Sequence, residues 1–149
     1  MHRLVINNVS KRFGARKVFD GISADLSTGG SLAIIGPNGS GNSTLVRCLL
    51  GLYRPTKGTI EYFEDDRKLS DDEFRNRTAF VSPYLNLYSQ LTGEENIKFF
   101  ATMRGVNVTG KQINAMLARG DIEGRGDDLL SEYSSGMGQR LKYAVALLS

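Results

Sequence analysis

Residues 31–44 read SLAIIGPNGSGNST, and this stretch decides the fold. Its first part, Ser31 to Gly36, is apolar without alternation, which favours a strand covered on both faces inside a sheet. From Ser43 to Leu52, apolar residues recur at the spacing of an amphipathic helix. A glycine-rich loop joins the two segments. A strand, a glycine-rich loop and a helix in this order are typical of a loop that binds phosphate groups.

The loop itself has the chemistry to bind phosphate. Its glycines permit backbone conformations that point successive N–H groups to one side, and the helix that follows adds a partial positive charge. Ser43 supplies a hydroxyl for Mg²⁺, but the residue before it, a lysine in the usual pattern, is Asn42. Without that lysine the loop alone would also fit a plain glycine turn. The residues expected to contact phosphate are Gly36, Asn38, Gly39, Ser40, Gly41, Asn42, Ser43 and Thr44.

The rest of the chain changes from strands to helices. Segments 3–8 and 17–26 predict an antiparallel strand pair, and further strands are expected at 59–63 and 78–82. A capping box of Thr92 and Glu95 predicts a helix that ends near Gly105, and helices are also expected over 111–119 and 135–148. The sequence therefore predicts one domain over 1–149, with a β-rich core to about residue 90 and a helical part from about residue 91.

Composition limits the classes of function. The chain has 149 residues, of which 40% are hydrophobic and 23% charged, and its net charge is +3. The basic residues are scattered, so we expect no nucleic-acid partner. The single cysteine, Cys48, fits a reducing compartment, and we expect a cytoplasmic protein. No apolar run approaches the roughly 18 residues that span a bilayer, so any membrane role would come through a partner.

A second motif, YSSGMGQR, occupies residues 133–140 at the start of the last predicted helix. On its own, a Ser/Gly cluster before a helix is usually an N-cap. Together with the glycine-rich loop, it resembles the ATP-binding domain of the ABC transporter family. The signature of that family lies at this distance from the phosphate loop, and one export-type subgroup has the SSGM form seen at Ser134, Ser135, Gly136 and Met137.

Three further blocks support the resemblance, which covers essentially the entire chain. Phe13 in KRFG, with Val18 beside it, matches the aromatic residue that stacks on adenine in the family; otherwise Phe13 is a core residue. GLYRPTKGTI at 51–60 matches the family's turn after the helix of the phosphate loop, and LNLYSQLTGEENI at 85–97 matches its run into the helical subdomain. The resemblance implies an α/β P-loop NTPase fold: a partial mixed sheet, an antiparallel N-terminal edge and an inserted helical subdomain.

The family mechanism is implied only where residues match. It implies a homodimer or heterodimer of ATP-binding domains in which ATP and Mg²⁺ lie between the phosphate loop of one domain and the signature of the other. Opening of the dimer on hydrolysis is transmitted to membrane-spanning permease subunits through the loop around residues 83–91. Such an ATP hydrolase lies on the inner face of the cell membrane, held there by its partner subunits, and the SSGM form favours export over import.

Several features depart from the family pattern. Asn42 lacks the lysine charge, Pro83 stands where a glutamine contacts Mg²⁺, and Gly138 stands where the subgroup has lysine. The family continues past residue 149 to a Walker B strand ending in Asp-Glu and to a switch histidine, whereas the only histidine here is His2. We therefore expect a truncated domain with impaired hydrolysis. The alternative is a non-catalytic pseudo-ATPase or regulatory nucleotide-binding module.

Overall fold

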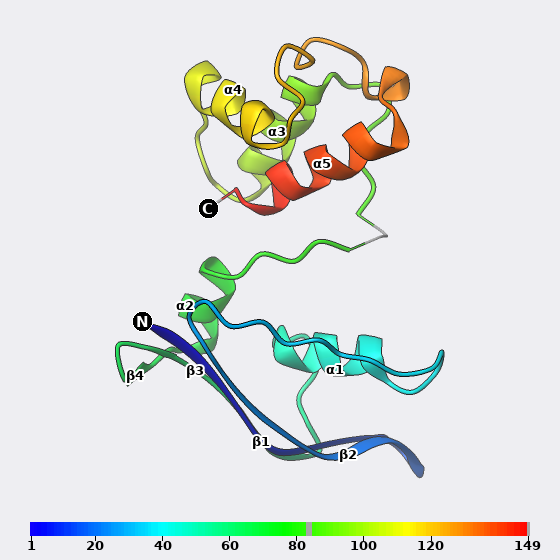
Figure 1. The fold of residues 1–149 in the computed structure, drawn as a ribbon, viewed down its shortest axis with the longest axis vertical. Coiled ribbons are helices and arrows are strands. Elements are labelled where there is room, and N and C mark those ends of the chain that lie inside the picture. Colours follow the sequence, from blue (N-terminus) through cyan, green and yellow to red (C-terminus); the bar gives the residue numbers. More distant parts are fainter. Residues whose placement is uncertain (83–84, 149) are drawn as a thin grey trace. The chain divides into compact units, whose positions relative to one another are not determined.

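The computed structural model describes residues 1–82 and 85–148. The chain forms two compact units, Met1–Thr78 and Ala79–Ser149. The first contains the sheet and the glycine-rich loop, and the second contains the helices that follow (Figure 1).

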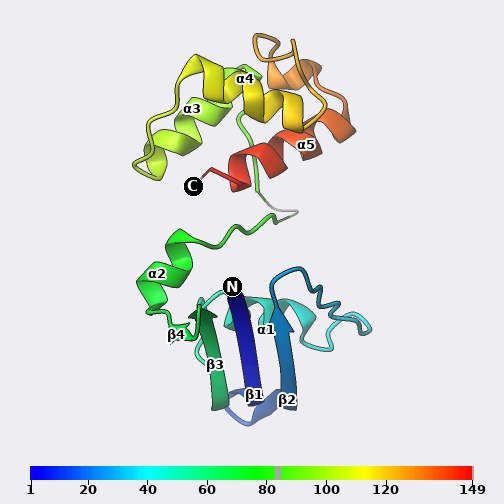
Figure 2. The ribbon, with the colours of Figure 1, turned by 60° about the vertical axis from the view of Figure 1, so that its left-hand side comes forward.

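An antiparallel sheet organises the first unit. Its order is β2-β1-β3-β4, and the strands are β1 (His2–Phe13), β2 (Arg16–Ser27), β3 (Lys57–Glu64) and β4 (Arg67–Lys68). Figure 2 shows β1 between β3 and β2. Gly14, with φ 56°, lies in the tight turn between β1 and β2. Phe13 and Arg16, on either side of this turn, are the first paired residues of the two strands. The predicted N-terminal antiparallel pair is confirmed.

Helix α1 (Asn42–Leu49) lies against one face of this sheet (Figures 1 and 2). It buries Leu45 and Cys48, and the hydroxyl of Tyr62 in β3 donates to the carbonyl oxygen of Leu49. Burial raises the pKa of Tyr62, which keeps this hydroxyl protonated as a donor. The predicted helix over 43–52 is confirmed but is shorter, because Gly51 has φ 69° and leaves the helical conformation.

Two predicted strands are wrong. Ser31–Gly36 and Thr78–Ser82 have no regular secondary structure, and the side chain of Ile35 is 90% exposed. An apolar run forms a buried strand only when neighbouring strands bond to its edges. Among the described residues, the strand pairings all lie within β1 to β4 and one isolated antiparallel bridge joins Thr92 to Leu129, so neither segment has such a neighbour. Apolar composition alone therefore does not make these segments strands.

A short helix, α2 (Asp71–Asn76), was not predicted. Its first turn is acidic and contains Asp71, Asp72 and Glu73. Ser70 and Glu73 make a capping box, in which the Ser70 hydroxyl accepts from the Glu73 N–H and the Glu73 carboxylate accepts from the Ser70 N–H. Negative charge at a helix N-terminus is favourable, so these acidic residues stabilise α2.

Helices α3 (Gly93–Met103), α4 (Gly110–Arg119) and α5 (Ser135–Ala146) enclose the core of the second unit, and a 3-10 turn, η1 (Leu130–Glu132), precedes α5. The predicted capping box of Thr92 and Glu95 is present, and Gly105 (φ 68°) follows the end of α3. All three predicted helices are confirmed. The buried core residues are Ile97, Ala101, Ile113, Leu117, Ile122, Leu141, Ala144, Val145 and Leu148.

Candidate nucleotide site

The glycine-rich loop and the first hairpin line one pocket of about 450 Å³. This volume lies within the range of small-molecule sites, about 300–1,000 Å³. Of the predicted residues, the pocket brings together Phe13, Val18, Asn38, Gly39, Gly41, Asn42, Ser43 and Thr44. Two further lining residues, Arg16 and Pro37, were not predicted. Gly36 and Ser40 do not line the pocket, but both bond to Asn42.

A β-bulge directs Val18 toward the loop. The register changes from Lys11 opposite Phe19 to Arg12 opposite Lys17, which leaves Val18 as the extra residue of β2. A Cβ atom at Gly41 would lie 2.6 Å from the Cγ1 atom of Val18, and Gly41 has φ 101°. Only glycine fits here, because a side chain would meet both a steric clash and an unfavourable backbone conformation. The loop therefore lies closer to β2 than it could with any residue other than glycine at position 41.

The start of α1 offers unoccupied N–H groups. Gly41 is the N-cap residue and no side chain caps the helix. Within residues 1–82 and 85–148, the N–H groups of Asn42, Ser43 and Thr44 have no acceptor, and the first bond of the helix runs from the Leu45 N–H to the Gly41 carbonyl, at 2.8 Å. Such groups, with the helix dipole behind them, form a favourable environment for an anion.

The side chain of Asn42 is used within the loop. Its Oδ1 accepts from the Ser40 hydroxyl at 3.1 Å, and its Nδ2 donates to the Gly36 carbonyl at 3.2 Å. The loop leaves no room for a larger residue at position 36, since a Cβ atom there would lie 2.6 Å from the Ser40 Oγ atom. Asn42 thus holds the two ends of the loop together and brings no charge to the pocket.

Phe13 is half-exposed where it lines the pocket. The residue is 49% exposed, and its ring contacts Tyr53 edge-on, with ring centroids 5.7 Å apart. The Nζ atom of Lys11 lies 4.9 Å from the centroid of the same ring. Aromatic and cationic contacts of this kind fix the orientation of a ring while leaving part of its surface free. The alternative assignment of Phe13 as a core residue does not fit this exposure.

The predicted signature lies in the second unit, at the start of α5. Ser134 is the N-cap residue, and its hydroxyl accepts from the Met137 N–H at 3.2 Å. Ser134, Ser135 and Gly136 are exposed, while Met137 packs in part against the core. This N-terminus is therefore both capped and open to solvent. Pro83, at the predicted glutamine position, lies outside the described residues.

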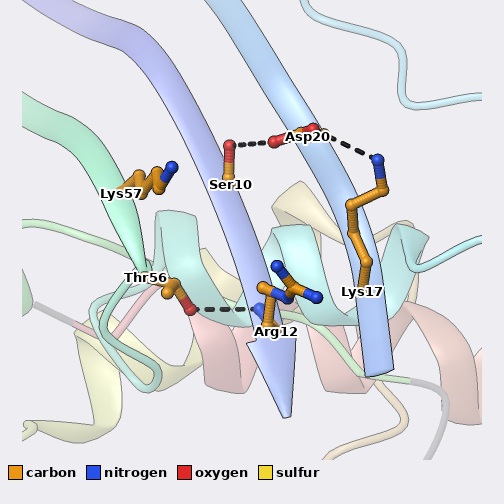
Figure 3. Close-up of a pocket in the computed structure, with 6 residues that line it drawn as sticks. All are labelled: Ser10, Arg12, Lys17, Asp20, Thr56 and Lys57. Atoms are coloured by element: carbon orange, nitrogen blue, oxygen red, sulfur yellow. Dashed lines mark hydrogen bonds and ion pairs between the residues drawn. The ribbon is translucent and has the colours of Figure 1, made fainter. Parts of the chain in front are cut away.

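A second, smaller pocket lies on β1 and β2 (Figure 3). It has a volume of about 200 Å³, and its lining residues are Ser10, Arg12, Lys17, Asp20, Thr56 and Lys57. Asp20 accepts from the Ser10 hydroxyl at 2.7 Å and forms an ion pair of 3.2 Å with Lys17. The Ser10 bond and the lysine lower the pKa of Asp20. The carboxylate is therefore held by its neighbours within this pocket.

The part of the chain that the structure describes contains no group of three or more His, Cys, Asp and Glu side chains that could hold a metal ion. No helix in that part has the length and apolar character needed to cross a bilayer. His2 is the first residue of β1, an inner strand of the sheet, and its Nε2 atom lies 4.0 Å from a Glu64 carboxylate oxygen.

Comparisons with known proteins agree with this geometry. The family model described as "ABC transporter" matches residues 19–149. A probable sulfate/thiosulfate import ATP-binding protein, CysA of Chlorella vulgaris, is 34% identical over 97% of this chain and 61% of its own length. A cytochrome c biogenesis ATP-binding export protein, CcmA of Cupriavidus pinatubonensis, is 31% identical over 96% of this chain and 62% of its own length. The chain thus spans about three fifths of these relatives.

Solved structures share the fold. The ATP-binding subunit of an ABC transporter superposes with a TM-score of 0.73 at 26% identity, covering 97% of this chain and 61% of that one. A dimeric ATP-binding cassette in a post-hydrolysis state, bound to ADP and Pi, has a TM-score of 0.70 at 26% identity, covering 97% and 69%. The α/β P-loop fold with an N-terminal antiparallel sheet is confirmed. This chain belongs to the ABC transporter family of ATP-binding proteins.

Proposed function

We propose that this chain binds ATP in the pocket between the first hairpin and the start of α1, as the ATP-binding subunit of a membrane transporter. One observation carries the proposal: a half-exposed aromatic ring and a helix start with unbonded N–H groups line the same pocket. The ring suits a nucleobase and the N–H groups suit phosphates. ATP has both parts, whereas inorganic phosphate would need only the second.

Each predicted residue has a proposed role in holding the nucleotide. Phe13 and Val18 would contact the adenine, and the loop from Gly36 to Thr44 would bind the phosphates through its backbone. Ser43 would provide a hydroxyl ligand for Mg²⁺, and phosphate oxygens would provide further ligands. When bound, the ion neutralises phosphate charge.

The signature supports a role in a dimer. Ser134, Ser135 and Gly136 are exposed at a helix N-terminus, where hydroxyl and backbone groups can meet a phosphate brought by a second ATP-binding domain. We therefore propose a homodimer or heterodimer that works with membrane-spanning permease subunits on the inner face of the cell membrane. The related dimeric cassette bound to ADP and Pi supports such an assembly.

We propose export as the direction of transport, on the SSGM form of residues 134–137. The relatives do not decide the direction, since one is an import protein and the other an export protein. Cells that lack the chain should accumulate the transported compound, which metabolite profiling would detect. Depletion of that compound inside the cells would contradict export.

We further propose that hydrolysis by this chain is weak. Asn42 brings no charge to the phosphates and its side chain is already bonded within the loop. This observation also favours the second candidate function, a nucleotide-binding module without turnover. The rate of phosphate release from ATP, measured for the chain and for Asn42→Lys, distinguishes the two. A weak enzyme should release phosphate faster after Asn42→Lys, whereas a binding module should release none in either form.

The test of nucleotide binding uses two phenylalanines of similar exposure. Phe13 is 49% exposed and lines the pocket, while Phe80 is 44% exposed and does not line it. Titration calorimetry with ATP should show that Phe13→Ala weakens binding about tenfold or more, because base stacking on an aromatic ring contributes about 1–3 kcal/mol. Phe80→Ala should leave the affinity unchanged. Equal effects of the two substitutions would refute the proposed site.

A further inference from the structure

We propose that Arg16 supplies the nucleotide's phosphates with the positive charge that position 42 lacks. This inference rests on the proposed function, ATP binding in the same pocket. Arg16 is the first residue of β2 and lines the pocket beside the glycine-rich loop. Among the described residues that line the pocket, Arg16 is the only one with a charged side chain.

The hairpin separates its basic side chains between two pockets. Arg12 and Lys17 are partners in register and both line the small pocket of Figure 3. The next pair in register, Phe13 and Arg16, lines the nucleotide pocket. Successive residues of a strand point to opposite faces, so this division follows from the pleat of the hairpin. The register of the hairpin therefore places Arg16 on the face of β2 that lines the pocket with the glycine-rich loop.

Arg16 is also available for a ligand. Its side chain is exposed, and it has no hydrogen bond or ion pair with any other described side chain or backbone group. Neighbouring basic groups are engaged: Lys17 pairs with Asp20 at 3.2 Å, and the Lys11 ammonium donates to the Arg54 carbonyl at 2.6 Å. Arg16 can turn toward an anion without breaking an existing contact.

The chemistry of the ligand favours an arginine at this place. A triphosphate has several negative charges, while the helix start and the loop offer only neutral N–H donors and the Asn42 side chain, which is uncharged, is bonded to Ser40 and Gly36. A charge-assisted hydrogen bond is roughly twice as strong as a neutral one, and a guanidinium can bind two phosphate oxygens at once. We expect Arg16 to contribute to the binding of phosphates and little to the binding of the base.

The experiment compares Arg16→Gln with Lys17→Gln, since Lys17 is the adjacent cation on the other pocket. Displacement of a fluorescent ATP analogue by ATP and by AMP gives the affinity of each variant. Arg16→Gln should weaken ATP binding about tenfold, on the scale of one charge-assisted contact, and AMP binding about threefold or less. Arg16→Lys should restore part of the ATP affinity, which also shows that the site is folded.

A double substitution tests whether Arg16 replaces the missing lysine. In the Asn42→Lys background, Arg16→Gln should cost less affinity for ATP than it costs in the natural chain, because the two cations would serve the same phosphates. Equal losses for ATP and AMP, or a loss no larger than that of Lys17→Gln, would overturn this inference alone. A chain that binds no ATP would overturn the proposed function together with it.

Discussion

The side-chain amide of Asn42 donates a 3.2 Å hydrogen bond to the carbonyl oxygen of Gly36, joining the first residue of α1 to the first residue of the glycine-rich loop. The same side chain accepts from Ser40, so both polar atoms of the amide are bonded within the loop. The residue that most clearly separates this loop from the usual phosphate-binding pattern therefore acts on the shape of the loop. Substitutions at position 42 can test this role.

Substitution of Asn42 by lysine should raise ATP affinity about tenfold, since an added charge-assisted contact contributes about 1–2 kcal/mol more than a neutral one. It should also raise the rate of phosphate release. Asn42→Asp is the matched control, because it removes the donor to Gly36 and adds a repulsive charge; it should lower affinity by a similar factor. Calorimetry with ATP checks both variants. An unchanged affinity in Asn42→Lys would show that position 42 does not reach the phosphates.

The contact between Gly41 and Val18 predicts a difference between two glycines of the loop. Both Gly39 (φ 83°) and Gly41 (φ 101°) have positive φ, so alanine costs about 1–2 kcal/mol of backbone strain at either. A Cβ atom at Gly39 meets nothing within 4 Å, whereas one at Gly41 meets Val18 at 2.6 Å. Gly41→Ala should therefore destabilise the first unit more than Gly39→Ala in thermal melts and should also weaken ATP binding. Equal shifts would contradict the close approach.

Asn96 fixes the segment that precedes α3. It is fully buried; its Oδ1 accepts from the Tyr88 N–H at 2.8 Å and its Nδ2 donates to the Thr92 carbonyl at 2.9 Å. Asn96→Ala should lower the free energy of unfolding by about 2–3 kcal/mol, because each buried group left unpaired costs about 1–3 kcal/mol. Urea denaturation measures the change. The exposed Asn107 provides the control, and Asn107→Ala should have little effect.

The capping box of α2 predicts a dependence on pH. Hydrogen bonds from Arg67 and from Ser70 lower the pKa of Glu73 from 4.5 to about 2. Because the folded pKa is lowered, the stabilising contribution of Glu73 is complete above pH 4.5 and is lost as the pH falls toward 2.

NMR titration of the Glu73 carboxyl should give the low pKa, and Arg67→Gln should raise it. Glu73→Gln should remove this part of the pH dependence of amide exchange in α2. A Glu73 carboxyl that titrates at the ordinary value in the natural chain would contradict the hydrogen-bonded geometry.

Local signals in the sequence predicted much of the fold. The capping box of Thr92 and Glu95 correctly marked the start of α3, because a side chain three residues away satisfies the backbone with no help from the rest of the protein. The same signal is present at Ser70 and Glu73, but no helix was predicted there, so α2 was missed.

Signals that depend on distant partners predicted less. Ser31–Gly36 is apolar enough for a buried strand. Its backbone groups, however, also need neighbouring strands as hydrogen-bond partners, and these must come from other parts of the chain. Arg16 was missed for a similar reason. Its side of the hairpin follows from the register of β1 with β2, and the bulge at Val18 that sets this register was not visible in the sequence. The clue in the sequence was that Arg16 follows Phe13, a predicted site residue, by three positions.

The residues of the nucleotide pocket all fall between Phe13 and Thr44, whereas the SSGM segment belongs to the other compact unit. Under the proposed function, substitutions that alter ATP binding and substitutions that alter the contact with a neighbouring subunit would fall in separate stretches of the gene. Under selection, a lineage could lose turnover in one stretch while the other continued to be maintained for assembly. The weak hydrolysis proposed from Asn42, beside the SSGM form kept at Ser134–Met137, would be one such combination.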